Sequence, residues 1–258
     1  MSMAWRALGA VVLWLCVGSS ADAARARPDR KAPTVAEQYD LGLKYMQRGY
    51  YVKALEQFNR IRNYHRDDPL AMRAELAIAD LHYKKAEWDQ ARLAYEDFLR
   101  MHPRHPEADY VVQRIGLTLY KKAPKAAGRD QTLTRQAVNT WSGFDSRFPE
   151  SVHKDEVVGL LAECRERLAR KELGIAEFYR GRAAWPAVEG RAAGLLVDHG
   201  GSPYDADALV LLVESHAWQG EGVEATKALD KLREVDAARV PEAERRLSRA
   251  RPPARDGG

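Results

Sequence analysis

Apolar residues follow one another along this chain with the spacing of amphipathic helices, and a short pattern returns at intervals of roughly 40 residues. In its first copy, a helical stretch with Gly42 and Tyr45 leads through Gly49 into a second stretch with Ala54 and then Phe58. A small residue anchors the second stretch of each copy, at Ala54, Ala91, Ala137, Val188 and Ala225. Small side chains let two helix backbones approach to packing distance. The pattern therefore predicts helix pairs that stack on one another.

Helix, turn, helix and a closing proline are typical of tetratricopeptide repeats. Breaks in the apolar pattern place helices at 34–48, 51–64, 69–85, 88–101, 107–121, 131–147, 185–199, 204–219 and 222–236. Residues 151–182 hold no proline, and we expect one long helix there or two in close succession. The sequence predicts an all-α fold, an α-solenoid of about five tetratricopeptide-like helix pairs. Solenoids of this kind usually bind other proteins.

The two ends of the chain differ from the repeats. Residues 1–23 combine a positive charge at Arg6 with an apolar run too short to span a bilayer and a small-residue cleavage pattern, so we expect a signal peptide and export. Residues 24–33 are basic and contain prolines, which indicates a flexible leader. Residues 238–258 carry several arginines and prolines, and we expect a basic disordered tail.

Cys16 lies inside the apolar run of the signal. A lipoprotein signal places a small residue directly before the modified cysteine, whereas Leu15 and the bulky Trp14 precede this one. We therefore expect Cys16 to be discarded with the signal. Lipidation at Cys16, which would anchor the protein in a membrane, is the alternative.

Composition and motifs narrow the class of function. Charged residues make up 30% of the chain, hydrophobic residues 45%, and the formal net charge is only +4. This balance lacks the dense basic stripe that nucleic-acid binding requires. The sequence holds none of the familiar catalytic or phosphate-binding motifs, so we expect neither an enzyme nor a cofactor. Prolines beside His102 and His105 argue for solvated loop histidines rather than a metal site. Cys164, without a catalytic partner pattern, is expected to be a small buried side chain.

Four stretches of the chain together resemble one protein family. They are Ala91-x-x-Ala94-x-x-x-Phe98-Leu99-Arg100-Met101-His102-Pro103-x-His105-Pro106-x-x-Asp109-Tyr110, Arg129-Asp130-Gln131-Thr132, Phe148-Pro149-x-Ser151, and Lys171-Glu172-x-x-x-Ala176-Glu177-x-Tyr179 with Ala184-Trp185-x-Ala187-Val188-x-x-Arg191. Over roughly residues 34–236 the chain resembles the D component of the outer-membrane β-barrel assembly machinery of Gram-negative bacteria. Members of that family are usually lipoproteins with five tetratricopeptide-like repeats. In this chain Gly200-Gly201-Ser202-Pro203 replaces the commoner Tyr-Pro-x-Ser turn.

The resemblance implies a non-enzymatic scaffold at the periplasmic face of the outer membrane. Repeats 1 and 2, residues 34–106, would form a pocket for segments of unfolded outer-membrane proteins. Repeats 3 to 5, residues 107–237, would dock on the central barrel-inserting subunit, alongside accessory assembly subunits. The resemblance assigns Glu177, Tyr179 and Arg191 to that docking, with Arg191 pairing an acidic residue of the central subunit. For Arg191, a solvated helix face is the alternative.

Residues that face the groove follow from helix positions within each repeat. On the first helices of repeats 1 and 2 these positions select Tyr39, Leu43, Met46, Gln47, Arg73, Leu76, Asp80, Tyr83 and Lys84. Aromatic and thioether side chains with flanking charge suit an extended peptide that ends in an aromatic residue. For Tyr39 and Met46 the alternative is a place in the core between repeats.

A second functional class stays open, the periplasmic tetratricopeptide adaptors of the Tol–Pal and cell-division system. Those adaptors usually carry an N-terminal coiled coil before their repeats. Here only residues 24–33 separate the signal from the first helix, and they contain no heptads. The sequence therefore favours the assembly scaffold.

Overall fold

The computed structural model describes residues 32–250, and its helices lie in one compact unit that starts at Val35. The first repeat pairs α1 (Val35–Gln47) with α2 (Tyr51–Tyr64), and the second pairs α3 (Pro69–Lys84) with α4 (Trp88–Met101). The third repeat consists of α5 (Ala108–Lys122) and α6 (Thr132–Trp141). Each of these helices begins and ends within about three residues of the bounds predicted from the sequence, except at the end of α6.

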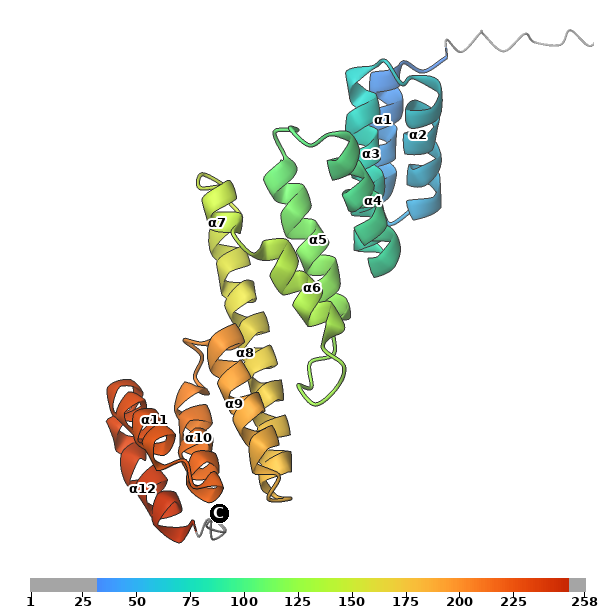
Figure 1. Cartoon of the computed structure of the whole chain (residues 1–258). Helices are drawn as coiled ribbons and strands as arrows, with labels where there is room; N and C mark the ends of the chain where they lie inside the picture. Colours follow the sequence, from blue (N-terminus) through green and yellow to red (C-terminus); the bar gives the residue numbers. More distant parts are fainter. Residues whose placement is uncertain (1–31, 251–258) are drawn as a thin grey trace, which may run out of the picture. The chain divides into compact units, whose positions relative to one another are not determined.

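The fourth repeat pairs α8 (Lys154–Arg180) with α9 (Trp185–His199), and the fifth pairs α10 (Asp205–Gln219) with α11 (Gly222–Val235). The stretch expected to form one long helix or two is thus a single helix, α8. Successive helices pack against one another along the unit, as Figure 1 shows. Residues 32–250 contain no strand, so the predicted all-α repeat fold is confirmed.

The small anchor residues lie at the helix crossings, as their size requires. Ala54, Ala91, Ala137 and Val188 are fully buried, and Ala225 is 1% exposed. The apolar side chains form three clusters, one around α1 to α3, one around α3 to α8, and one around α8 to α12. The N-terminal half of α8 belongs to the second cluster and its C-terminal half to the third. The long helix therefore joins the third repeat to the fourth without a loop.

The helix predicted at 131–147 is broken, because Gly143 adopts a left-handed conformation with φ of 69°. α6 ends at Trp141, and a one-turn helix, α7 (Phe144–Arg147), follows. Trp141 is fully buried and Phe144 is 1% exposed. The backbone N–H and the hydroxyl of Ser142 both donate to the Val138 carbonyl oxygen, at 2.8 and 2.7 Å, and so cap the end of α6. The bend turns both aromatic side chains into the core.

The tail expected to be disordered from residue 238 is helical where the structure describes it. A 3-10 turn, η1 (Ala237–Arg239), leads into α12 (Val240–Arg249). Ala243 is fully buried against the third cluster, and Arg246 donates to the buried Glu214 at 2.6 Å. Because α12 covers the exposed side of the fifth repeat, it acts as the terminal cap that solenoids need. The signal, Cys16, most of the leader and residues 251–258 lie outside the described residues.

Candidate functional site

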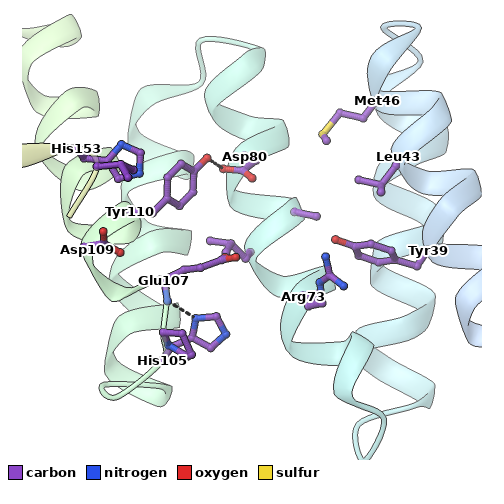
Figure 2. Close-up of a pocket in the computed structure, with 14 residues that line it drawn as sticks. Tyr39, Leu43, Met46, Arg73, Asp80, His105, Glu107, Asp109, Tyr110 and His153 are labelled. Atoms are coloured by element: carbon purple, nitrogen blue, oxygen red, sulfur yellow. Dashed lines mark hydrogen bonds between the residues drawn. The ribbon is translucent and has the colours of Figure 1, made fainter. Parts of the chain in front are cut away.

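The first helices of repeats 1, 2 and 3 face a common groove of about 740 Å³, which we call the first groove. Its volume falls in the range of binding pockets. Figure 2 shows α1 on one side, α3 between, and the start of α5 on the other. The residues that line it are Tyr39, Leu43, Met46, Arg73, Leu76, Ala77, Asp80, His105, Pro106, Glu107, Asp109, Tyr110, Val152 and His153.

The wall from α1 is largely apolar. Tyr39 packs its ring on Phe58 at a centroid distance of 5.7 Å, which fixes the ring beside Leu43 and Met46. The Arg73 guanidinium lies 5.4 Å from the centre of the Tyr39 ring. Burial raises the pKa of the Tyr39 hydroxyl, and Arg73 opposes that shift. This wall offers a large, adaptable surface to an apolar side chain.

Asp80 forms the polar floor of the groove. One of its carboxylate oxygens accepts hydrogen bonds from the Tyr95 hydroxyl at 2.5 Å and from the Tyr110 hydroxyl at 2.7 Å. Burial raises the pKa of Tyr110 to about 12, with the negative charge of Asp80 as the next cause. The pKa of Tyr95 is raised further, again chiefly by burial. These bonds tie repeat 2 to repeat 3 and hold the carboxylate in one place.

The wall from α5 is held in place by the loop that precedes α8. Ser151 Oγ donates to Asp109 at 2.6 Å and accepts from the backbone N–H of His153 at 3.1 Å. The rings of His153 and Tyr110 lie 5.6 Å apart. The Phe148-Pro149-x-Ser151 stretch therefore positions the far side of the first groove.

The histidines of the loop between α4 and α5 are partly buried rather than solvated. His102 and His105 both pack against Phe98, with centroid distances of 4.9 and 5.1 Å. His102 also contacts Glu75 at 3.0 Å across the repeat. Both histidines thus hold the loop between α4 and α5 against the core, and this loop carries Glu107. The expectation of solvated loop histidines was wrong for this reason.

The first groove gathers most of the residues predicted for peptide binding. Tyr39, Leu43, Met46, Arg73, Leu76 and Asp80 line it. Tyr83, Lys84 and Gln47 do not: Tyr83 packs against Trp88 and Arg114, and Lys84 and Gln47 are exposed at helix ends. The contribution of the third repeat was not predicted. Its signal in the sequence is Tyr110, which lies one repeat after Arg73 at the same helix position.

A second groove, of about 660 Å³, lies along the C-terminal half of α8. It is lined by Ala127, Gly128, Arg170, Lys171, Gly174, Ile175, Phe178 and Tyr179. Phe178 is 52% exposed, and the Arg182 guanidinium stacks on its ring at 3.6 Å. Tyr179, predicted for partner docking, lines this second groove, whereas Phe178 was not predicted.

The other two predicted docking residues stand outside the second groove. Arg191 of α9 donates to Glu172 of α8 at 3.0 Å, and its side chain is 48% exposed. Glu177 is an exposed residue of α8. Within the chain, Arg191 is therefore partly exposed and already paired with Glu172. A partner protein would have to compete with Glu172 for this arginine.

The Arg129-Asp130-Gln131-Thr132 stretch shapes one edge of the second groove. Gln131 is fully buried, and its side-chain amide donates to the carbonyl oxygens of Pro124 and Ala126 at 3.2 and 2.9 Å. The Thr134 hydroxyl donates to the side-chain oxygen Oε1 of Gln131 at 2.6 Å. The loop that carries Ala127 and Gly128 is thereby closed on the start of α6.

Within residues 32–250, one group of side chains has the spacing of metal ligands, Glu189, His216 and Glu221. His216 and Glu221 contact each other at 2.7 Å across the turn between α10 and α11. His82 and Glu87 make the same 2.7 Å contact across the equivalent turn of repeat 2. A pair that recurs at a repeat turn is explained by closure of that turn, so the metal interpretation gains no support. Cys164 is fully buried, and burial raises the pKa of its thiol to about 11.

Helix pairs that stack in chain order define an all-α helical-repeat protein, and this one has two grooves on its surface. The family model described as YfiO, outer membrane lipoprotein, matches residues 31–232, and this chain belongs to that family. Within residues 32–250 the structure has no helix with the length and hydropathy needed to cross a membrane.

Two relatives of this chain carry the same name. The outer membrane protein assembly factor BamD of Haemophilus influenzae is 27% identical over 85% of this chain and 84% of its own length. The protein of the same name from Pasteurella multocida is 25% identical over 83% of both chains. Among solved structures, a tetratricopeptide-repeat protein of Thermus thermophilus covers 83% of this chain and 98% of its own, with 17% identity and a TM-score of 0.35.

Proposed function

We propose that this chain is a non-enzymatic scaffold of outer-membrane protein assembly, which holds extended segments of unfolded outer-membrane proteins in the first groove. The relatives named as assembly factors support the process, and the first groove supports the binding role. The main support for this role is that the apolar side chains of α1 and the fixed polar groups of α3 and α5 line the same groove. A folded barrel has no free strand to offer there, so the occupant is an unfolded segment.

The side chains of the first groove suit such a segment. Leu43 and Met46 are partly buried and give an apolar surface that adapts to different side chains. Asp80 and Asp109 are held by hydrogen bonds within the chain, so they form a rigid polar side. A flexible apolar wall opposite a rigid polar wall binds many sequences, as a protein that serves many substrates must.

The C-terminal repeats supply the second half of the proposal, docking on the central barrel-inserting subunit. Phe178 is an exposed aromatic residue beside Tyr179, and partly exposed aromatic residues are frequent anchors of protein interfaces. Arg170 and Lys171 line the same second groove, and Arg182 stacks on Phe178 at its edge. We therefore propose that an apolar side chain of the central subunit, flanked by acidic residues, enters the second groove. Glu177 of α8 and Arg191 of α9 would belong to the same docking surface.

Site-specific photo-crosslinking tests the first groove. A photoreactive residue at position 43 should crosslink to unfolded outer-membrane proteins in whole envelopes, because Leu43 faces the first groove. A photoreactive residue at Val52, which is 71% exposed on α2 and does not line the first groove, is the matched control. Equal yields at the two positions, or no substrate crosslink at position 43, would refute substrate binding at this groove.

A further inference from the structure

Charge is unevenly distributed in the first groove. Three carboxylates line it, those of Asp80, Glu107 and Asp109, whereas its lining holds one guanidinium, that of Arg73. In Figure 2 the acidic residues stand on α3 and at the start of α5, opposite the apolar wall of α1. One wall therefore attracts apolar groups and the other attracts positive charge.

We propose that the first groove selects extended segments in which a lysine or arginine directly adjoins an aromatic or large aliphatic residue, and that it disfavours segments with a carboxylate in that place. This inference rests on the proposed binding of unfolded segments by the first groove. It names the chemistry of the preferred segment, a cation next to an apolar side chain.

The three carboxylates are not neutralised by neighbours. Within residues 32–250 none of them forms an ion pair. Asp80 and Asp109 accept hydrogen bonds from hydroxyl groups, which fix their oxygens but leave the negative charge. Besides Arg73, Arg114 is a cation in this region, but its guanidinium lies 4.8 Å from the centre of the Tyr110 ring and is not part of the lining of the groove. A cationic ligand would supply the missing charge.

Arg73 does not reverse this balance for an incoming carboxylate. Its guanidinium stacks on Tyr39, and the charges of Asp80 and Glu107 also reach that tyrosine, where they raise the pKa of the hydroxyl. A ligand carboxylate near Arg73 would therefore approach one cation and two anions. Recognition of a carboxylate usually depends on several donors that converge without opposing charges.

The spacing of the two ligand groups follows from the geometry of an extended chain. Successive side chains of an extended segment point to opposite sides. If the first residue places its side chain against Leu43 and Met46, the next residue places its side chain toward Asp80 and Glu107. Directly adjacent residues are therefore selected, rather than residues two positions apart.

Two amidated, N-acetylated fluorescent peptides test the inference with the mature chain. Both carry a central tyrosine in a Ser- and Thr-rich background, followed by lysine in one peptide and by glutamate in the other. We expect the lysine peptide to bind about tenfold more tightly at low salt, since several partly exposed charge interactions add to this size. The ratio should fall as salt is added, because exposed charges are screened.

Three variants locate the effect. Glu107→Gln should reduce the preference for lysine about threefold, since it removes one of three carboxylates. Glu56→Gln, at an exposed position of α2 outside the lining of the first groove, is the matched control and should leave the preference unchanged. Tyr39→Ala should weaken both peptides, because it removes the apolar contact that they share.

The outcomes separate the two levels of the proposal. If both peptides bind equally and Tyr39→Ala weakens that binding, the charge preference is overturned and the proposed function stands. Binding of neither peptide, or binding that Tyr39→Ala does not change, would overturn both. A lysine preference that survives Glu107→Gln unchanged would overturn the assignment of the charge to this wall.

Discussion

Gly116 of α5 lies directly against the indole of Trp141 in α6, and a Cβ added to Gly116 would clash with Cε2, Nε1 and Cζ2 of that indole. The first repeat contains the same arrangement, in which a Cβ on Gly42 would lie 2.6 Å from Phe58 Cε1. In repeat 2 a pair of buried residues, Ala79 and Tyr95, takes the corresponding positions. The small residue of one helix thus makes room for the aromatic residue of its partner.

Substitution at this contact should destabilise the fold. We expect Gly116→Ala to lower the free energy of unfolding by about 1–3 kcal/mol, because Trp141 is fully buried and has no space to move. Gly159→Ala in α8 is the matched control, since no atom lies within 4 Å of its added Cβ. At Gly159 the higher helix propensity of alanine should raise the free energy of unfolding by about 0.5–1 kcal/mol. Urea unfolding that moves both variants in the same direction would contradict this packing.

Two repeat turns use alanine where the backbone is left-handed. Ala86 and Ala183 have φ of 57° and 53°, while glycine occupies the equivalent positions at Gly49 and Gly220. Left-handed conformation costs an alanine about 1–2 kcal/mol, and the greater freedom of glycine in the unfolded chain offsets part of this cost. Ala86→Gly should therefore raise the free energy of unfolding by about 0.5–1 kcal/mol. Gly49→Ala is the reverse control and should lower it; thermal unfolding measures both.

The hydrogen bond from Tyr110 to Asp80 predicts a dependence on alkaline pH. Burial and Asp80 raise the pKa of Tyr110 from its ordinary value of 10.0 to about 12. The folded chain holds this proton more tightly than the unfolded chain. The contribution of the protonated Tyr110 hydroxyl to the free energy of unfolding is therefore complete below pH 10 and is lost as pH rises through 12. Tyr110→Phe should be less stable than the parent by about 1 kcal/mol at neutral pH. The difference between the two should shrink from pH 10 to 12 in unfolding measurements, and a constant difference would contradict the assignment.

The repeat fold could be predicted from the sequence because its signals are local. Small residues such as Ala54 and Ala91 mark helix crossings wherever they recur, and prolines mark the ends of helices. The bend at Gly143 was missed, because a single glycine near a helix end is compatible with a helix as well as with a break. α12 was missed because its arginines suggested disorder, whereas in the structure Arg246 pairs with Glu214, 32 positions earlier in the chain.

The grooves were harder to predict than the fold. Tyr39 and Asp80 were found because helix positions alone decide which face they occupy. Tyr83 occupies a suitable position too, but Arg114 of the next repeat covers its ring, a contact that no pattern within repeat 2 contains. Glu107 and His153 reach the first groove from loops, whose course depends on contacts such as Ser151 to Asp109. A site built from several repeats therefore needs the packing between them.

The N-terminus of the mature protein gives a separate prediction. If Cys16 is removed with the signal, protein purified from envelopes should begin at or near Ala24 and carry no acyl chain. It would then be held at the membrane through its partner, because lipid anchoring needs covalent chains worth roughly 0.8 kcal/mol per buried CH₂. Intact-mass measurement decides the question. A species that begins at Cys16 with added acyl chains, as in the lipoproteins for which the family is named, would show that the prediction is wrong.

Arg191 provides the sharpest prediction for partner docking. Arg191→Glu should weaken association with the central barrel-inserting subunit by about 2 kcal/mol or more, if a desolvated ion pair forms at the centre of the interface. Within the chain the change replaces the contact with Glu172 by two carboxylates in the same place. Since Arg191 is 48% exposed, this should alter stability by no more than about 1 kcal/mol. Helix content should stay the same, because Val188, Ala192 and Leu195 form the buried face of α9.

Two controls separate a docking defect from a folding defect. Arg191→Gln removes the ion pair with Glu172 without reversing the charge, so it should weaken association less than Arg191→Glu does. Arg60→Glu reverses an exposed charge on α2, away from the C-terminal repeats, and should leave association unchanged. Co-purification of the three variants with the central subunit from detergent-solubilised envelopes gives the comparison. If Arg191→Glu recovers as much central subunit as the parent chain, Arg191 is not part of the interface. Docking would then have to be assigned to Tyr179 and Phe178 of the second groove, where Phe178→Ser is the next variant to measure.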